Sequence, residues 1–293
     1  MTTSRRSRAG VALAALVLAS CQAGPDAGAP RRSQARLEPR AVAGDGFVHT
    51  LFVAPGADAD AGQPVFVFLE GDGRPWRRGG TRPATNPDPR RSVAYELVAV
   101  QQSGAFLLGR PCYHDRARDP GCEPELWTSG RYSERVVASM AAALRRAIAG
   151  QRAAPVVLVG YSGGGSLALL IADRVPQVSA VLTLAANLDL DAWTRHHGYL
   201  PLASSLDPLA THRRPPGCEI HIAAERDSVV PPSLLESAVR QRPGVLLWVE
   251  PDADHACCWS ARWSRIVQQV MQQLDAADCF AVDRRETSDG TGP

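Results

Sequence analysis

The sequence predicts an α/β fold in which a mostly parallel sheet is flanked by helices on both faces. Short apolar runs that suit buried strands, such as 65–69 and 156–159, alternate with stretches of helical spacing. The second of these runs breaks at 160–164 into the pattern Gly-x-Ser-x-Gly and continues as an Ala-rich helical stretch. About 240 residues lie between the two terminal segments, a length that suits one globular domain.

The expected elements follow one another in the order that a parallel sheet needs. An antiparallel strand at 47–53 comes first, and the buried strand 65–69 follows it. Ser133 is a suitable N-cap for a helix over 134–144, because its hydroxyl can accept a backbone N–H from the first turn. The remaining expected elements are a helix at 92–101, strands at 105–109, 156–159, 180–184, 219–224 and 245–250, and helices after Ser162 and His255. This alternation places helices on both faces of the sheet.

The segment 187–216 interrupts this alternation of strands and helices. It is longer than an ordinary connection and contains Trp193, Tyr199 and Leu200 among polar residues. We expect it to form a small cap over the site; a packed surface excursion is the alternative. Trp76, Trp127 and Trp193 are expected to be pocket or core aromatics.

The first 20 residues are expected to be a signal peptide. A basic segment at 5–8 precedes an almost entirely apolar run at 9–19. This run is too short for a hydrocarbon core of about 30 Å, which needs about 20 residues. A membrane-spanning anchor is therefore not expected here.

A lipid anchor is expected instead at Cys21. Leu18-Ala19-Ser20-Cys21 resembles a bacterial lipobox, in which cleavage precedes an acylated cysteine. An ordinary signal peptide with a nearby cysteine is the alternative. Gln22 follows the cysteine, as in lipoproteins sorted to the outer membrane. We therefore expect a lipid-anchored protein of the bacterial cell envelope that faces the periplasm.

The remaining domain boundaries follow from composition. Residues 21–40 are rich in Ala, Pro, Gly and Arg and are expected to be a flexible spacer. Residues 282–293 are expected to be a disordered tail, which leaves 41–281 as the globular domain. A protein beginning near Arg40 should therefore keep the whole core.

Ser162 is the expected nucleophile. At the tip of a sharp turn between strand and helix, its hydroxyl would be pushed out of the sheet. Gly160 and Gly164 are needed there because a Cβ at either position would collide with the neighbouring strand or helix. The helix that begins at the serine also directs unpaired amides and its positive dipole end toward developing negative charge.

Asp227 and His255 are expected to complete a catalytic triad. Asp227 follows the expected strand 219–224, and His255 follows the strand 245–250. A serine hydroxyl is a weak nucleophile at neutral pH, so the histidine would take its proton and the aspartate would orient the histidine. The order Ser, Asp, His differs from the chymotrypsin and subtilisin orders.

Other residues compete for these two roles. Asp189, Asp191, Asp252 and Asp254 are alternative acids because each lies after a strand or near His255. Of the other histidines, those within strand patterns are expected to be structural, and the rest belong to the cap or its exit. These are His49, His221, His196, His197 and His212.

An oxyanion hole is expected from two backbone amides. One belongs to Gly163, directly after the nucleophile. The other is assigned to Asp72, whose flanking glycines allow the chain to expose that N–H after the strand 65–69. Glu70 is expected to be structural, as a buried partner for a backbone amide or an arginine.

From about residue 47 to 280 the chain resembles an α/β-hydrolase, with nucleophile elbow, acid, histidine and oxyanion loop all present. Several phrases further resemble a group of bacterial hydrolase lipoproteins. These are Glu70-Gly71-Asp72-Gly73-Arg74-Pro75-Trp76, Trp127-Thr128-Ser129, Arg131-Tyr132-Ser133 and His255-Ala256-Cys257-Cys258-Trp259. One departure is Glu70, which stands where many members have a His-Gly pair. The resemblance implies a cofactor-independent serine hydrolase, and it leaves the detailed loop geometry open.

The expected function is hydrolysis of a small-molecule carboxylic ester through an acyl-enzyme. An amidase or peptidase with the same triad is one alternative, and a non-catalytic lipid-tethered binding protein is another. The net charge of +2 gives no reason to expect a nucleic-acid partner. The sequence leaves the acyl chain, the alcohol and the oligomeric state open.

Six cysteines remain after Cys21, and disulfides are the expected state in an oxidising envelope. Cys112 with Cys122 and Cys218 with Cys279 are the favoured pairs. Cys257 and Cys258 can pair with each other or with one of those four. A zinc site is the competing interpretation, but adjacent cysteines lack the two-residue gap that is usual between zinc ligands.

Overall fold

The computed structural model describes residues 37–54, 63–78, 80–101, 104–114, 116, 119–150, 154–212, 218–242 and 244–280. All of them belong to one compact unit, Gln34–Pro293. The predicted signal peptide, Cys21 and the predicted disordered tail lie outside the described residues. No helix of the described part is long and apolar enough to cross a membrane.

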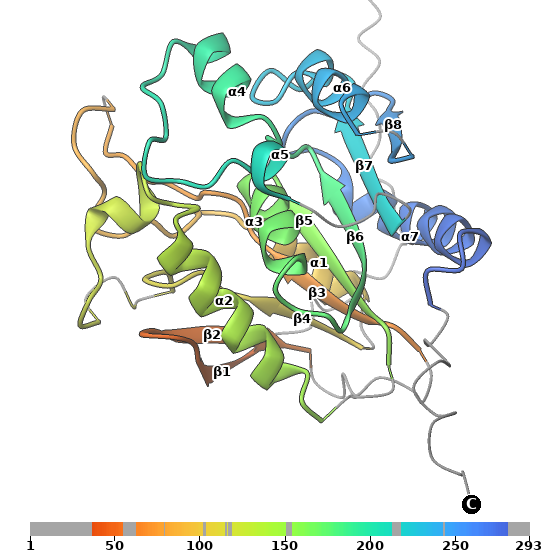
Figure 1. Ribbon diagram of the computed structural model, residues 1–293, viewed down its shortest axis with the longest axis horizontal. Coiled ribbons are helices and arrows are strands. Elements are labelled where there is room, and N and C mark those ends of the chain that lie inside the picture. The colour runs from red at the N-terminus through yellow and green to blue at the C-terminus, as the bar shows by residue number, and fades with distance from the viewer. Residues whose placement is uncertain are drawn as a thin grey trace, which may run out of the picture. The chain divides into compact units, whose positions relative to one another are not determined.

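The described strands form one eight-stranded sheet in the order β1-β2-β4-β3-β5-β6-β7-β8 (Figure 1). The first two strands pair antiparallel, as do β2 and β4, and all later pairs are parallel. The strands are β1 (Glu38–Ala43), β2 (Val48–Val53), β3 (Val65–Leu69), β4 (Ala105–Leu108), β5 (Val156–Tyr161), β6 (Val178–Leu184), β7 (Glu219–Ala224) and β8 (Leu246–Glu250). The predicted mostly parallel α/β sheet is confirmed.

Helices cover both faces of this sheet, and each face has its own apolar core. Residues of α2, α3 and α6 pack on one face, and residues of α1 and α7 pack on the other. Ser133 caps α2 as expected, accepting the N–H of Val136. The helices are α1 (Val93–Gln101), α2 (Glu134–Ala147), α3 (Gly163–Ala172), α4 (Leu190–His197), α5 (Pro208–Thr211), α6 (Pro232–Arg240) and α7 (Trp259–Ala276), with a 3-10 turn at Pro124–Trp127.

The structure corrects the predicted end of the spacer at residue 40. Strand β1 begins at Glu38 and pairs with β2 in the register Glu38↔Val53 to Ala43↔Val48. Leu37, just before it, is buried. Strand β1 lies at the edge of the sheet and is held mainly by backbone hydrogen bonds to β2, so it needs few buried apolar side chains. Its composition therefore resembles that of a spacer. A protein beginning at Arg40 would therefore lack part of the sheet.

Three disulfides join the six described cysteines. Cys112–Cys122 and Cys218–Cys279 each have a Cα–Cα distance of 5.7 Å, so both favoured pairs are confirmed. The adjacent Cys257 and Cys258 pair with each other, which settles the alternatives left open by the sequence. Among the described residues, no cluster of three His, Cys, Asp or Glu side chains could hold a metal ion.

Candidate active site

Ser162 lies at a strained turn between β5 and α3. Its φ of 53° and ψ of −125° fall outside the regions that serine ordinarily adopts. The turn is possible because a Cβ on Gly160 would strike the backbone of Gly164 and Gly165, and a Cβ on Gly164 would strike the carbonyl of Leu69. The glycines of the motif therefore allow α3 to pack directly on β3 and β5.

The three residues of the predicted triad lie in one hydrogen-bonded line. Nε2 of His255 is 3.1 Å from Oγ of Ser162, and its Nδ1 is 2.7 Å from Oδ2 of Asp227. Oδ1 of Asp227 accepts the backbone N–H groups of Val229 and Val230 at 2.7 and 2.8 Å. The carboxylate is therefore fixed by the turn after β7, with one oxygen left to orient the imidazole.

The alternative acids are engaged elsewhere. Asp189 caps α4 by accepting the N–H of Ala192 at 2.8 Å, and Asp191 is exposed in the first turn of that helix. Asp252 pairs with Arg226 at 2.9 Å. Asp254 accepts two backbone N–H groups of the loop that follows it. The structure thus brings only Asp227 of these five to the histidine ring.

Four of the five competing histidines have structural partners. His49 is bonded to Ser139 at 2.8 Å, and burial lowers its pKa to about 4. His221 contacts Thr183 at 2.7 Å, and burial lowers its pKa as well. His212 pairs with Glu219 at 2.6 Å, while His197 lies 2.8 Å from the carbonyl of Val229. None of these four contacts Ser162.

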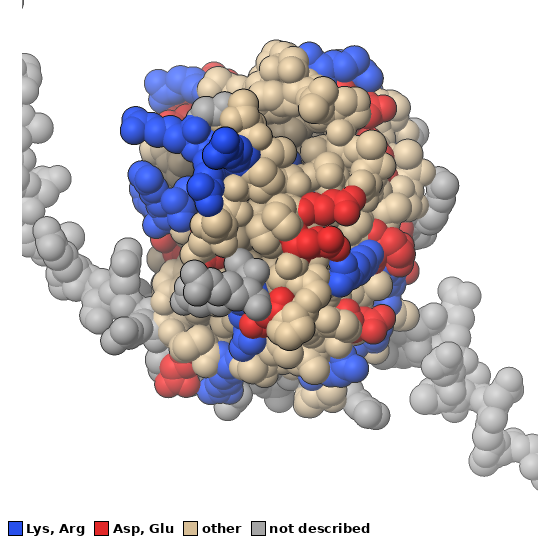
Figure 2. Space-filling model, turned by 90° about the vertical axis from the view of Figure 1, so that its left-hand side faces the viewer, with Lys and Arg blue, Asp and Glu red and all other residues tan. Residues whose placement is uncertain are grey.

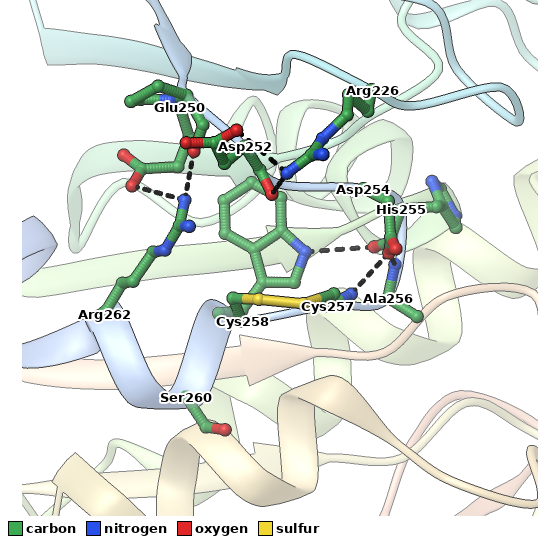
Figure 3. Close-up of a disulfide and its surroundings, with 12 residues drawn as sticks. Arg226, Glu250, Asp252, Asp254, His255, Ala256, Cys257, Cys258, Ser260 and Arg262 are labelled. Atoms are coloured by element: carbon green, nitrogen blue, oxygen red, sulfur yellow. Dashed lines mark hydrogen bonds and ion pairs between the residues drawn. A yellow bond between two sulfur atoms is a disulfide. The ribbon is translucent and has the colours of Figure 1, made fainter. Parts of the chain in front are cut away.

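Several contacts fix the position of the loop that carries His255, and Figure 3 shows its surroundings. The carbonyl of His255 accepts hydrogen bonds from Tyr161 Oη at 2.9 Å and from Trp259 Nε1 at 3.0 Å. The side chain of Asp254 accepts the backbone N–H groups of Ala256 and Cys257, and a disulfide joins the adjacent Cys257 and Cys258 just before α7 begins. Cys258 has a φ of 80°, so the chain turns sharply there.

The predicted oxyanion loop packs against the elbow. A Cβ on Gly71 would lie 3.2 Å from Cβ of Ser162, and one on Gly163 would collide with the Asp72 carboxylate. Within the described part of the chain, no acceptor takes the backbone N–H of Asp72 or of Gly163. Both amides therefore remain able to donate to a ligand.

The side chain of Asp72 is held by a network that the sequence analysis did not identify. Its carboxylate accepts hydrogen bonds from Arg110 at 2.7 Å, from Arg131 at 2.8 Å and from Tyr132 at 2.7 Å. Burial raises the pKa of the carboxyl, but the charges of Arg131 and Arg110 prevail and lower it to about 2. The only sequence signal was the Arg131-Tyr132 pair within a phrase of the resemblance. These contacts hold the loop that carries the Asp72 amide.

Glu70 is structural, although its partner differs from the expected amide or arginine. Its buried Oε1 lies 2.6 Å from Nε2 of His114, which follows the Cys112 turn. The predicted oxyanion loop is thus held through both Glu70 and Asp72. The two side chains reach different parts of the 110–132 segment, whose location the sequence pattern does not reveal.

A cavity of about 930 Å³ opens above Ser162 and His255. The segment 73–92 forms one wall, and the predicted cap supplies another through Trp193, Tyr199 and Leu200. Trp76 also lines the cavity, whereas Trp127 is buried in the core and donates to the carbonyl of Ala84. The described part of the predicted cap thus borders the site.

Comparison with known proteins gives a fold but no close relative. No protein-family model matches the chain, and no curated protein matches it. An α/β serine hydrolase without a lid from Xanthomonas campestris is 13% identical, with a TM-score of 0.51 over 82% of this chain and 94% of that one. An esterase from Pyrococcus furiosus is also 13% identical, with a TM-score of 0.55 over 82% and 93%.

A third similar structure is a longer chain. A puromycin-hydrolyzing peptidase from Mycobacterium tuberculosis is 14% identical, with a TM-score of 0.57 over 82% of this chain and 39% of that one. At these identities the likenesses concern the fold. Together with the sheet order and the elbow, they confirm the predicted α/β-hydrolase fold.

Proposed function

We propose that this α/β-hydrolase-fold protein is a serine hydrolase that cleaves carboxylic esters through an acyl-enzyme. The observation that carries the proposal is the line from Ser162 through His255 to Asp227, at 3.1 and 2.7 Å, on the floor of a cavity. A nucleophile, its base and the group that orients the base are all in place. No metal or organic cofactor takes part in the proposed steps.

The proposed reaction has two halves. Oγ of Ser162 attacks the carbonyl carbon while its proton passes to Nε2 of His255; the C–O bond then breaks, and the leaving alcohol takes that proton. Water next attacks the acyl carbon and gives a proton to His255. The carboxylic acid leaves as Ser162 regains its proton. Asp227 keeps Nδ1 protonated throughout and stabilises the imidazolium.

The backbone amides of Gly163 and Asp72 are proposed to bind the oxyanion of each tetrahedral intermediate. Such donors are effective because they are already oriented before charge develops, and removal of one typically costs about 10² to 10³ in kcat. The Asp72 side chain positions its own amide, since Arg110, Arg131 and Tyr132 fix the carboxylate. It is a positioning group and does not contact the substrate carbonyl.

Esters are favoured over amides by the site. Several side chains that line the cavity are apolar, as for an acyl chain. An amidase or peptidase remains the second candidate, and one of the similar structures is a peptidase. The test compares 4-nitrophenyl esters of graded chain length with the matching anilides. We expect turnover of the esters, and turnover of the anilides alone would establish the second candidate.

Removal of the Cys257–Cys258 disulfide is expected to lower activity more than stability. The bond constrains the backbone two residues after His255, and a displacement of about 1 Å at a catalytic group can cost about 100-fold in rate. We expect a fall in kcat of about 10- to 100-fold for Cys257→Ser/Cys258→Ser, with little change in Tm. Steady-state kinetics and thermal unfolding measure the two effects.

The matched control for this prediction is Cys218→Ser/Cys279→Ser. That disulfide closes a separation of 61 residues at the opposite end of β7, so its loss should destabilise the fold by up to about 4 kcal/mol. The folded control should keep its kcat. If the first variant has normal kcat, the adjacent disulfide does not position His255.

Attachment to the envelope through Cys21 is also a proposal. We infer that the mature protein begins with an acylated Cys21 and faces the periplasm from the outer membrane. Cys21→Ala should give a protein without lipid at its amino terminus, because the thiol is the acylation site. Mass spectrometry of the mature amino terminus checks this, and an unmodified terminus at another residue in the natural protein would contradict it.

A further inference from the structure

The segment that forms one wall of the cavity carries six described arginines, of which Arg91 lines the cavity itself. The described residues of 74–91 include Arg74, Arg77, Arg78, Arg82, Arg90 and Arg91, all exposed. A backbone bridge joins Trp76 to Pro83, and the N–H of Arg77 donates to the carbonyl of Arg82 at 2.8 Å. These contacts form a hairpin that gathers three arginines at its tip. This segment lies on the side of the molecule in Figure 2, where basic side chains form a patch beside a hollow.

Most of these arginines have no counter-charge. Within the described residues, the side chains of Arg77, Arg78, Arg82 and Arg90 make neither ion pairs nor hydrogen bonds, whereas Arg91 pairs with Glu96. Elsewhere on the surface the exposed arginines differ: Arg145, Arg146, Arg195 and Arg240 have no carboxylate partner among the described residues, whereas others form ion pairs. Such pairs are Arg40 with Glu38, Arg135 with Glu123 and Arg226 with Asp252. The hairpin, whose Trp76 and Gly80 line the cavity, thus carries uncompensated positive charge on side chains next to the cavity.

A further guanidinium borders the cavity near its floor. Arg131 is only 5% exposed, and it donates from Nε to the carbonyl of Thr128 at 2.6 Å and from Nη1 to Asp72 at 2.8 Å. Its Nη2 has no acceptor among the described residues and is not one of the fully buried unsatisfied atoms, so it is open to solvent. Oxygen atoms of a ligand in the cavity could accept a hydrogen bond from it.

The mouth of the same cavity also carries apolar side chains. Leu200 is 86% exposed and Tyr199 is 56% exposed on the cap side, and Trp76 is 41% exposed on the hairpin. Val229 lines the cavity as well and is partly exposed. Large apolar groups that gather around an opening indicate a surface that contacts an apolar ligand. The cavity thus has apolar side chains at its mouth and lies next to the cationic hairpin.

We propose that the substrate is an anionic ester: an apolar chain that lies along the cap and a carboxylate or phosphate that is attracted by the arginine hairpin. This substrate class rests on the proposed hydrolase function and specifies it. The unpaired guanidinium groups would raise the local concentration of such a substrate and orient it, with Arg131 available as a donor for its oxygen atoms. The shared chemistry is a negative charge on an apolar ester, either as a soluble molecule or as the head group of a lipid.

Two pairs of substrates test this proposal and distinguish the two sources. The soluble pair is mono-4-nitrophenyl adipate and 4-nitrophenyl hexanoate, which share a leaving group and an acyl length and differ by one carboxylate. The lipid pair is vesicles of phosphatidylglycerol or of phosphatidylcholine with the same acyl chains, with release of fatty acid as the readout. In at least one pair, we expect kcat/KM to be higher for the anionic member by about 10-fold or more at low salt. The preference should decline at high salt because the Debye length shortens.

The variant Arg77→Gln/Arg78→Gln/Arg82→Gln should lower the ratio of anionic to neutral kcat/KM by about 10-fold. The matched control, Arg145→Gln/Arg146→Gln/Arg240→Gln, removes the same charge from helices that do not line the cavity and should keep the ratio. Arg78→Glu alone should lower the ratio further than Arg78→Gln. Equal values for both members of both pairs, with neutral esters hydrolysed, would overturn the substrate class and leave the hydrolase proposal standing. Absence of all turnover together with absence of fluorophosphonate labelling would overturn both.

Discussion

Ser162→Ala is expected to abolish fluorophosphonate labelling and to lower kcat for ester hydrolysis by about 10⁵-fold or more. The substitution removes the attacking oxygen and leaves the rest of the site in place. Ser162 is partly exposed at the elbow, and its Oγ has a hydrogen bond only to His255 among the described residues. We therefore expect stability to change by no more than about 0.5 kcal/mol. Gel detection of the label, kinetics and thermal unfolding measure the three quantities.

Ser166→Ala is the matched control for this prediction. Ser166 lies one turn further along α3, where its Oγ donates to the carbonyl of Asn187 at 2.6 Å and is fully buried. Its loss should cost about 1 kcal/mol of stability for one buried hydrogen bond, while labelling continues. Persistent labelling of purified Ser162→Ala would exclude Ser162 as the nucleophile.

His255→Ala is expected to lower kcat by about 10⁶-fold and Asp227→Asn by about 10⁴-fold. Loss of the imidazole removes the proton acceptor altogether. In Asp227→Asn, the amide oxygen can keep the two backbone N–H groups of Val229 and Val230, which places the NH₂ group against Nδ1 of His255. The ring would then carry its proton on Nε2, where it cannot accept the proton of Ser162. Single-turnover kinetics with a chromogenic ester check both values.

Asp189→Asn provides the control for the acid. Asp189 follows β6, a position that some hydrolases use for the acid, but here it caps α4. Asparagine is also a good N-cap, so activity and stability should both be nearly unchanged. Near-full activity in Asp227→Asn combined with a large loss in Asp189→Asn would show that the acid is misassigned.

The elements that the sequence predicted well are those with a strong local signal. The buried strand β3 is five consecutive apolar residues, and α2 has a cap at Ser133 and helical spacing. Strand β1 was missed because it contains a proline and few apolar residues, and it depends on pairing with β2. Helix α6 was also missed. Two prolines directly after the Asp227 turn resemble a loop, although Pro232 stands at the first helical position, where proline is favoured, and Leu235 and Ala238 form the buried face.

The sequence by itself determined the nucleophile elbow, the order of the three triad candidates and the α/β fold. Each depends on local pattern: glycines around Ser162, and polar residues at the ends of apolar strands. Tertiary structure alone decided which aspartate reaches His255, because Asp189 and Asp227 follow neighbouring strands and only the backbone beyond β7 turns its carboxylate toward the ring. It also decided that Arg110, Arg131 and Tyr132 converge on Asp72, since these side chains come from positions 38 to 60 residues away along the chain. Contacts between distant segments leave no periodic trace in a sequence, and the support of the proposed oxyanion loop consists of such contacts.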